Sequence, residues 1–270
     1  MVRSGDVAVV IPARNEADRV GATVAGAAGL PGVDLVLVVD DGSRDGTATA
    51  AAGAGASVVR HSRSRGKAAA MESGAEAVRL LDTRDRRPQP RHLLFLDGDL
   101  GQTAADAAPL TEPVRAGEAD MTIAVFTDRV VRGGHGFVVA LSGAGIERAT
   151  GWRPAQPLNG QRCLTRAAFE AARPLAPGFG VETALTIDLL RRGMRIREVE
   201  VPLAHRATGT DWRAQLHRAR QFADVARALA VRQAGARRPG SRQAGPGSRQ
   251  AGPGSRPAEP TSREPEPGRG

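Results

Sequence analysis

Two carboxylates one residue apart, Asp97 and Asp99, follow the apolar run "HLLFL" and could bind a divalent metal. Carboxylate oxygens are hard ligands, and the glycine between the two residues lets the backbone bend closely around a cation. Mg²⁺ usually takes one or two carboxylates and completes its shell with phosphate oxygens and water. The pair is therefore a candidate site for a divalent metal that also holds a phosphate-bearing ligand.

Three further clusters of polar residues follow apolar runs upstream, "PARNE" (12–16), "DDGS" (40–43) and "SRGK" (64–67). A carboxylate at the end of a strand, such as Asp41, can accept hydrogen bonds from a ribose or a base edge. Lys67, beside a glycine at the start of a helix, suits a uracil carbonyl or a phosphate. Each cluster alone has an ordinary structural explanation, as a turn, a helix cap or a solvated cation. Their significance depends on whether the fold brings them together.

The elements that must position these clusters are short apolar runs that alternate with Ala-rich helical stretches. We expect strands over Val7–Ile11, Asp34–Asp40, Ala56–Arg60 and His92–Asp97, each followed by a helix. The runs are rich in Val and Leu without alternation, which is typical of strands buried on both faces of a parallel sheet. In such an α/β layer, ligands bind at the carboxyl ends of the strands. The fold would therefore bring all four clusters to one rim.

The second half of the chain is less regular. Its patterns predict strands over Met121–Phe126 and Ile196–Val201, and helices over Phe137–Ala149, Glu182–Arg192 and Trp212–Leu229. The last helix carries an apolar stripe opposite a basic face, which favours packing against the core over lying on a membrane surface.

Composition indicates a soluble cytoplasmic protein. The 270 residues are 41% apolar, and the single cysteine, Cys163, excludes an internal disulfide and indicates a reduced compartment. The first apolar run is too short for a signal peptide, and no run reaches the roughly 18 residues of a membrane span. Association with the inner face of the membrane, and a homodimer, stay open.

The net charge of +9 is only weak evidence for a nucleic-acid partner, because +4 of this charge falls on residues 233–270. That segment has no Val, Leu, Ile, Phe or Trp and repeats the heptapeptide "SRQAGPG". It cannot bury enough apolar surface to offset its ordering entropy, so we expect a disordered tail. A basic nucleic-acid-binding protein remains the non-enzymatic alternative, and no specific nucleic acid is expected.

Four stretches, "VVIPARNEADRV", "LVVDDGSRDGT", "RSRGKAAAMESG" and "LLFLDGDL", resemble the successive motifs of family 2 glycosyltransferases of the GT-A fold. The resemblance covers about Val7–Leu100. It implies an α/β fold with one Rossmann-like domain and a mostly parallel central sheet over residues 1–232. Residues 1–117 would form the nucleotide-sugar half and residues 118–232 the acceptor half, with the tail at 233–270.

The same resemblance implies roles for individual residues. The nucleotide would lie against three residues of the first cluster, Pro12, Arg14 and Glu16. Asp41 would reach the base or ribose, and Lys67 the uracil or a phosphate. Asp97 and Asp99 would be the Asp-x-Asp pair that binds Mg²⁺ or Mn²⁺.

Downstream, Gln156–Gly193 and Val201–Trp212 are similar to the acceptor half of glucosyl-3-phosphoglycerate synthases. That similarity implies that Glu182 holds the donor sugar and that His205 completes the metal site. The implied reaction transfers a sugar from a nucleoside diphosphate donor, UDP-glucose-like, to a small acidic acceptor. The loop Arg129–Phe137 departs from the family's Gly-Arg-x-Thr phosphate grip, so a polyprenyl phosphate acceptor of cell-envelope glycan synthesis remains the alternative.

Two other enzyme classes lack their motifs. A dinucleotide-dependent oxidoreductase needs Gly-x-Gly-x-x-Gly after the first strand, where this chain has "PARNE". A sugar nucleotidyltransferase would carry a Gly-rich pyrophosphate loop with Arg and Lys at the same place, and this loop is absent. The sequence therefore favours a metal-dependent glycosyltransferase.

Overall fold

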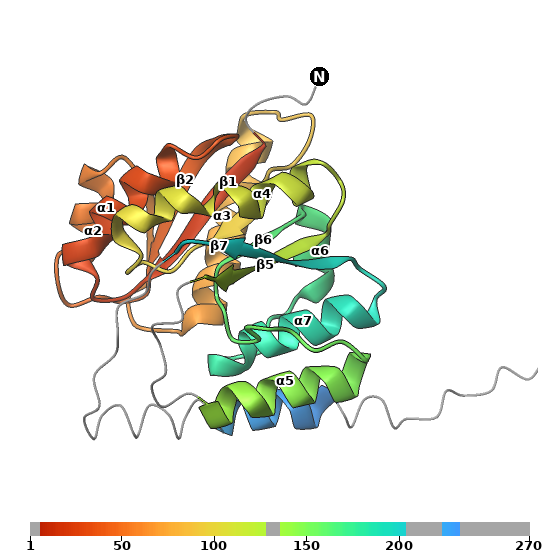
Figure 1. The fold of residues 1–270 in the computed structure, drawn as a ribbon. Coiled ribbons are helices and arrows are strands. Elements are labelled where there is room, and N and C mark those ends of the chain that lie inside the picture. Colours follow the sequence, from red (N-terminus) through yellow and green to blue (C-terminus); the bar gives the residue numbers. More distant parts are fainter. Residues whose placement is uncertain (1–5, 128–135, 204–222, 233–270) are drawn as a thin grey trace, which may run out of the picture. The chain divides into compact units, whose positions relative to one another are not determined.

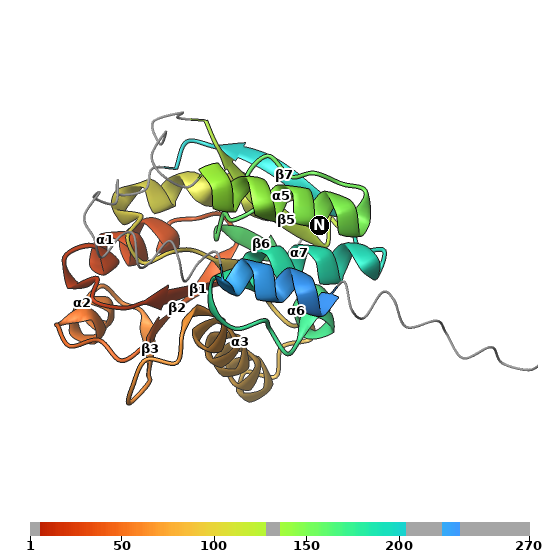
Figure 2. The same cartoon turned by 90° about the horizontal axis from the view of Figure 1, so that it is seen from below.

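The computed structural model describes residues 6–127, 136–203 and 223–232, which all belong to one contact unit spanning Met1–Arg237 (Figures 1 and 2). Its centre is a seven-stranded sheet in the order β3-β2-β1-β4-β6-β5-β7. The strands are β1 (Val7–Ala13), β2 (Val33–Asp40), β3 (Ser57–Arg60), β4 (His92–Phe95), β5 (Met121–Phe126), β6 (Arg162–Leu164) and β7 (Ile196–Val201).

Helices cover both faces of the sheet. They are α1 (Ala17–Ala28), α2 (Thr47–Gly53), α3 (Lys67–Arg84), α4 (Ala108–Arg115), α5 (Gly136–Thr150), α6 (Arg166–Ala172) and α7 (Val181–Arg191), with the 3₁₀ turns η1 (Gly101–Ala107) and η2 (Gly178–Gly180). Residues 223–232 are also helical, and this helix is blue in Figure 1. Across these described ranges, no helix combines the length and hydropathy that a membrane span requires.

The side chains of β1 show why its sequence does not alternate between apolar and polar residues. Val7, Val9 and Ile11 pack into one core cluster with α1, α2 and α4, whereas Ala8 and Val10 pack into a second cluster with α3, α6 and α7. All five are fully buried. A strand buried on both faces needs apolar residues at every position, as the sequence predicted.

The predicted α/β fold with a mostly parallel sheet is confirmed. Strand β1 pairs in parallel with β2 and β4, β3 with β2, and β5 with β7. Strand β6 is the exception, because it lies antiparallel between β4 and β5. The sequence did not predict β6 or the following α6. A three-residue strand is too short to show a periodic pattern, and its place in the sheet depends on neighbours that are distant in sequence.

The last described helix partly matches the predicted helix Trp212–Leu229, because residues 223–232 are helical. Val225 and Leu229 pack with Val138 and Ile146 of α5 in a third apolar cluster. A Cβ atom at Gly145 would collide with Leu229, so the two helices approach closely there. The predicted tail at 233–270 and the domain boundary at residue 232 stay predictions, because residues 233–270 lie outside the described ranges.

Candidate functional site

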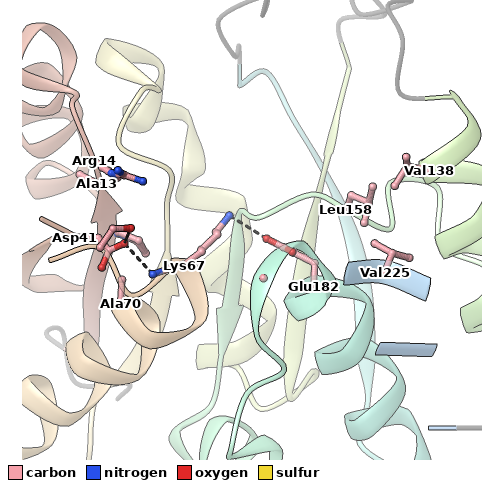
Figure 3. Close-up of a pocket in the computed structure, with 13 residues that line it drawn as sticks. Ala13, Arg14, Asp41, Lys67, Ala70, Val138, Leu158, Glu182 and Val225 are labelled. Carbon is pink, nitrogen blue, oxygen red and sulfur yellow. Dashed lines mark hydrogen bonds and ion pairs between the residues drawn. The ribbon is translucent and has the colours of Figure 1, made fainter. Parts of the chain in front are cut away.

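A pocket of about 570 Å³ lies at the carboxyl ends of β1 and β2 and extends to the start of α7 (Figure 3). Arg14 and Asp41 lie on one side and the apolar side chains Val138, Leu158 and Val225 on the other, with Lys67 and Glu182 between them (Figure 3). Of the predicted residues, those that line it are Pro12, Arg14, Asp41, Lys67 and Glu182. The fold therefore brings three of the four clusters and Glu182 to one cavity.

The turns after β1 and β2 are tied to each other. Asn15 has a left-handed backbone, with φ of 56°, and its side-chain oxygen accepts a hydrogen bond from the Arg44 N–H at 2.9 Å. In return, the Asn15 N–H donates to Ser43 Oγ at 3.0 Å, and the Glu16 N–H donates to Thr47 Oγ1 at 2.9 Å. These side-chain contacts fix the backbone directly after Arg14.

Asp41 organises the loop that leads from β3 to Lys67. Its Oδ1 accepts from His61 Nδ1 at 2.7 Å and the Arg65 N–H at 2.8 Å, and its Oδ2 from Ser64 Oγ at 2.7 Å and the Gly66 N–H at 2.9 Å. Burial favours the neutral carboxyl, but these four donors outweigh it and hold the pKa of Asp41 below its usual value. Asp41 is therefore ionised, and its carboxylate oxygens already accept four hydrogen bonds from the protein.

Lys67, the first residue of α3, bridges two carboxylates. Its Nζ lies 2.7 Å from Asp97 Oδ1 and 3.0 Å from Glu182 Oε1. Burial opposes the charge, but Asp97 and Glu182 outweigh it and hold the pKa of Lys67 above its usual value. Lys67 is also the only lysine among the 38 Lys and Arg residues of the chain. A Cβ atom at Gly160 would collide with its Nζ, so the space suits a compact ammonium.

The Asp97-Gly98-Asp99 turn is held from behind by α1. Thr23 Oγ1 donates to the Gly98 carbonyl at 3.0 Å, and Arg19 Nη1 donates to the Asp99 carbonyl at 3.0 Å. A Cβ atom at Gly98 would lie 3.0 Å from Ala13 Cβ, which explains the glycine between the two carboxylates. Asp97 adjoins the pocket through Lys67, whereas Glu16 and Asp99 lie outside its lining.

Glu182 enters the site from the first turn of α7, where a carboxylate is favoured by the helix dipole. Its main-chain carbonyl accepts a hydrogen bond from Arg162 Nη1 at 3.0 Å. Gln161, the residue before Arg162, donates from Nε2 to Asp97 Oδ2 at 2.9 Å. Neither Gln161 nor Arg162 was a predicted site residue. Both lie in the stretch Gln156–Gly193 that resembles the acceptor half of the family, but the polar "NGQR" residues have no periodicity of a strand or helix.

The metal-binding prediction is only partly within the described residues. His205 and the loop residues Arg129 and Arg132 lie outside them, and the described ranges hold no cluster of three or more His, Cys, Asp or Glu residues suited to a metal. Asp97 is held on both oxygens, by Lys67 and Gln161. Two carboxylates on one tight turn fit a hard divalent cation, with Asp97 oriented by the protein.

Residues 8–158 match the family model described as glycosyl transferase family 2. This match covers more than half of the chain, which therefore belongs to that family. The chain is 31% identical over 212 residues to glycosyltransferase AglJ of Haloferax volcanii, covering 76% of this chain and 65% of that protein. It is 28% identical over 202 residues to glucosyl-3-phosphoglycerate synthase of Mycolicibacterium paratuberculosis, covering 69% and 60%. The chain thus spans less than two thirds of the length of these curated relatives.

Solved structures confirm the GT-A fold. Glucosyl-3-phosphoglycerate synthase from Mycobacterium tuberculosis, crystallised with Mn²⁺, UDP and phosphoglyceric acid, superposes with a TM-score of 0.67 and 26% identity, covering 84% of this chain and 78% of that one. The same enzyme with Mg²⁺ and UDP superposes with a TM-score of 0.65 and 25% identity, covering 84% and 79%. Nucleotide and divalent metal are therefore bound together in these relatives.

Proposed function

We propose that this protein is a metal-dependent glycosyltransferase that moves a sugar from a uridine-linked nucleoside diphosphate donor to a small acidic acceptor. The observation that carries the proposal is the Lys67 bridge. One ammonium joins Asp97, on the nucleotide half, to Glu182, on the acceptor half, at the middle of the pocket. A donor whose diphosphate lies near Asp97 would then have its sugar near Glu182.

The nucleotide would bind at the side of the pocket that carries Pro12, Arg14 and Asp41. Because Asp41 already accepts four hydrogen bonds, it supports this seat mainly by ordering the loop from His61 to Gly66. Lys67 is directed away from Asp41 and toward Glu182 (Figure 3), and its Nζ also contacts Asp97. We therefore assign Lys67 to a phosphate oxygen of the donor, in preference to the uracil ring.

Asp99 would hold a Mg²⁺ or Mn²⁺ ion, with Asp97 beside it and His205 as the third protein ligand. Such an ion neutralises the charge that develops on a diphosphate leaving group. Glu182 would accept hydrogen bonds from the sugar hydroxyls and orient the ring, because a carboxylate accepts stronger hydrogen bonds than a neutral oxygen does. An acceptor that attacks through an ionised phosphate oxygen needs no general base, whereas an attacking hydroxyl would pass its proton to a phosphate oxygen of the leaving group.

A second acceptor class, a polyprenyl phosphate, is favoured by one observation. The side of the pocket opposite Arg14 consists of the apolar side chains Val138, Leu158 and Val225. The neighbouring Phe137 is 72% exposed at the start of α5. An apolar wall beside the reacting groups suits an acceptor with a hydrocarbon chain better than a small acid. With that acceptor, association with a membrane surface would follow.

The test is a comparison of donors and acceptors on the full chain. Calorimetry should detect UDP-glucose binding that strengthens when Mn²⁺ is added. Turnover is then measured with 3-phosphoglycerate and with a short polyprenyl phosphate. Faster turnover with 3-phosphoglycerate supports a small acidic acceptor, and faster turnover with the polyprenyl phosphate supports a lipid-linked acceptor. Absence of binding to every UDP and GDP sugar, with or without Mn²⁺, would overturn the proposed function.

A further inference from the structure

The segment Asn159–Arg162, which we call the NGQR segment, lies directly beside the Asp97-Gly98-Asp99 turn, because β6 and β4 are neighbouring strands. Strand β6 is antiparallel to β4, and Arg162 pairs with Phe95. Continuing this register by two residues sets Gly160 opposite Asp97. The distances agree, because a Cβ atom at Gly160 would lie 3.1 Å from Asp97 Oδ2. The amino end of β6 therefore faces the rim at which the parallel strands end.

Gln161 holds Asp97 on the side away from Lys67. Its side chain is fully buried, and its Nε2 donates to Asp97 Oδ2 at 2.9 Å, while Lys67 Nζ contacts Oδ1 at 2.7 Å. The Gln161 N–H donates to Asn159 Oδ1 at 2.9 Å, which fixes the start of the strand. A neutral amide orients the carboxylate without adding a charge that would compete with a metal.

Arg162 holds Glu182 through the main chain. Its side chain is 1% exposed, and Nη1 donates to the Glu182 carbonyl at 3.0 Å and to Thr186 Oγ1 at 2.8 Å. Nε donates to the Asn159 carbonyl at 2.8 Å, and Nη2 to the Pro157 carbonyl at 3.1 Å. One guanidinium thus fastens the first turn of α7 to the loop that carries the NGQR segment.

A guanidinium is costly at this place, and its hydrogen bonds to two parts of the site offset the cost. Burial lowers the pKa of Arg162 to about 10, with partial compensation from Glu182 and Glu198. Its hydrogen-bond partners are three carbonyls and a hydroxyl, so no described carboxylate forms an ion pair with it. A buried ion without a close counter-ion has a large desolvation cost, and these four hydrogen bonds, which join the loop to the first turn of α7, offset it.

We propose that Gln161 and Arg162 are positioning residues that hold Asp97 and Glu182 at the spacing required by the donor. This inference rests on the proposed function, since it assigns both carboxylates to one nucleotide sugar. Gln161 fixes the carboxylate on the nucleotide side, and Arg162 fixes the helix turn that presents the carboxylate on the sugar side. The NGQR segment therefore sets the distance between the carboxylates of Asp97 and Glu182, which Lys67 contacts at the same time.

The first experiment uses Lys67 as a reporter in the metal-free protein. Because the chain has one lysine, ¹³C-labelled lysine gives one side-chain NMR signal set. Gln161→Leu and Arg162→Met, neither of which adds a lysine, should each shift the Lys67 ε-carbon resonance, because each changes the geometry of one of its two carboxylates. Arg91→Met is the matched control. Arg91 is another buried arginine, in contact with Asp34 and Asp82 away from the pocket, so its loss should lower stability and leave the Lys67 signal in place.

The second experiment separates the two positioning roles by binding and kinetics. Gln161→Leu should reduce the Mn²⁺-dependent gain in UDP affinity about 10-fold and leave metal-free UDP affinity unchanged, as expected for a residue that orients a metal-site carboxylate. Arg162→Lys should raise the donor KM about 10-fold, with Arg162→Met more severe, because lysine restores only part of the carbonyl network. If Arg162→Met does not fold, Arg162→Lys and Gln161→Leu decide the question.

The outcomes distinguish this inference from the proposed function. If the wild-type protein binds no nucleotide sugar, the proposed function fails, and the inference that rests on it falls as well. If the wild-type protein turns over its donor, but Gln161→Leu leaves both the Lys67 signal and the Mn²⁺-dependent gain in UDP affinity unchanged and Arg162→Lys leaves the donor KM unchanged, only the positioning inference is overturned. If Gln161→Leu and Arg162→Lys lose as much thermal stability as Arg91→Met but keep unchanged kinetics, the positioning inference is likewise overturned.

Discussion

Strands β3, β2, β1 and β4 run in parallel and end at the rim that carries the pocket, whereas β6 begins there. In the parallel part, each site residue follows its strand within a few positions, as Arg14 follows β1 and Asp41 follows β2. On the other side, Glu182 comes from a helix start, and Arg162, which holds it, is the first residue of β6. The two parts meet at Lys67, which contacts one carboxylate from each.

This difference concerns how a site residue is supported. Asp41 is held at its carboxylate by side chains and N–H groups of one loop, 20 to 25 residues later in the chain. Glu182 is held through its main-chain carbonyl by Arg162, 20 residues earlier. Substitutions on the parallel side should therefore act mainly on chemistry and local order, and substitutions on the other side mainly on the placement of the sugar.

The largest effect is expected for Asp99→Asn, which removes the proposed metal ligand on the parallel side. We expect kcat to fall by about 10²–10³-fold, as for other losses of charge stabilisation in a transition state. Steady-state turnover at saturating donor and Mn²⁺ measures this. Asp106→Asn, in the exposed part of η1, is the matched control and should keep full activity. Near-normal turnover of Asp99→Asn at saturating Mn²⁺ would contradict the metal role.

Glu182→Gln should weaken the contacts to the sugar and leave the contacts to the nucleotide unchanged. UDP lacks the sugar, so its affinity should stay unchanged, whereas turnover of the UDP-sugar should fall about 10–100-fold, equivalent to the roughly 1.5–3 kcal/mol of a hydrogen bond to a charged group. Calorimetry with UDP and kinetics with the UDP-sugar give the two numbers. Equal losses in both would mean that Glu182 supports the whole pocket and does not act on the sugar alone.

The parallel side of the site was predictable because its signals are local. Asp97, Lys67 and Arg14 each follow an apolar run, and the strand-end rule for parallel sheets was enough to bring them together. Glu182 was predicted only through the family resemblance, since a glutamate in the first turn of a helix is common. His205 was predicted in the same way and stays a prediction.

Gln161 and Arg162 were not predictable by these rules, for two physical reasons. Strand β6 has three residues and no periodic pattern, so its antiparallel direction depends on pairing with β4 and β5. In addition, Arg162 acts through carbonyl oxygens, which every residue has, so no side-chain pattern in the sequence records the contact. Only the folded chain shows which carbonyls it reaches.

A smaller effect is expected for Lys67→Met, at the point where the two parts meet. The free energy of unfolding should fall by about 2–3 kcal/mol, less than for a fully buried pair because the Lys67 side chain is 30% exposed. Its pKa is raised in the folded state, so this contribution is complete below the unfolded value of about 10.4 and is lost as the pH rises through the folded value.

Urea unfolding of wild type and Lys67→Met at pH 7, 9 and 11 measures that dependence. The chain has no tyrosine, and its single cysteine, whose pKa burial raises to about 12, adds the same pH dependence to both proteins and cancels in their difference. The difference between the two proteins should be constant from pH 7 to 9 and begin to shrink only above about 10.4. Lys67→Arg keeps the charge but should also lose stability, because Gly160 leaves no room for a guanidinium.

The smallest effect is expected for Asp41→Asn, on the parallel side of the site. The amide offers one acceptor oxygen where the carboxylate offers two, so the free energy of unfolding should fall by roughly 1–2 kcal/mol near neutral pH. The pKa of Asp41 is lowered in the folded state, so its contribution is present above the unfolded value of about 3.9 and is lost as the pH falls through the folded value. Denaturation at pH 7, 5 and 3 should show a constant difference that narrows only at pH 3. The control is Asp45→Asn, on the exposed side of the same turn. It should lower the free energy of unfolding less than Asp41→Asn does at every pH. If Asp41→Asn instead abolished nucleotide binding with no loss of stability, Asp41 would contact the nucleotide directly, and the role assigned to it in ordering the loop from His61 to Gly66 would be wrong.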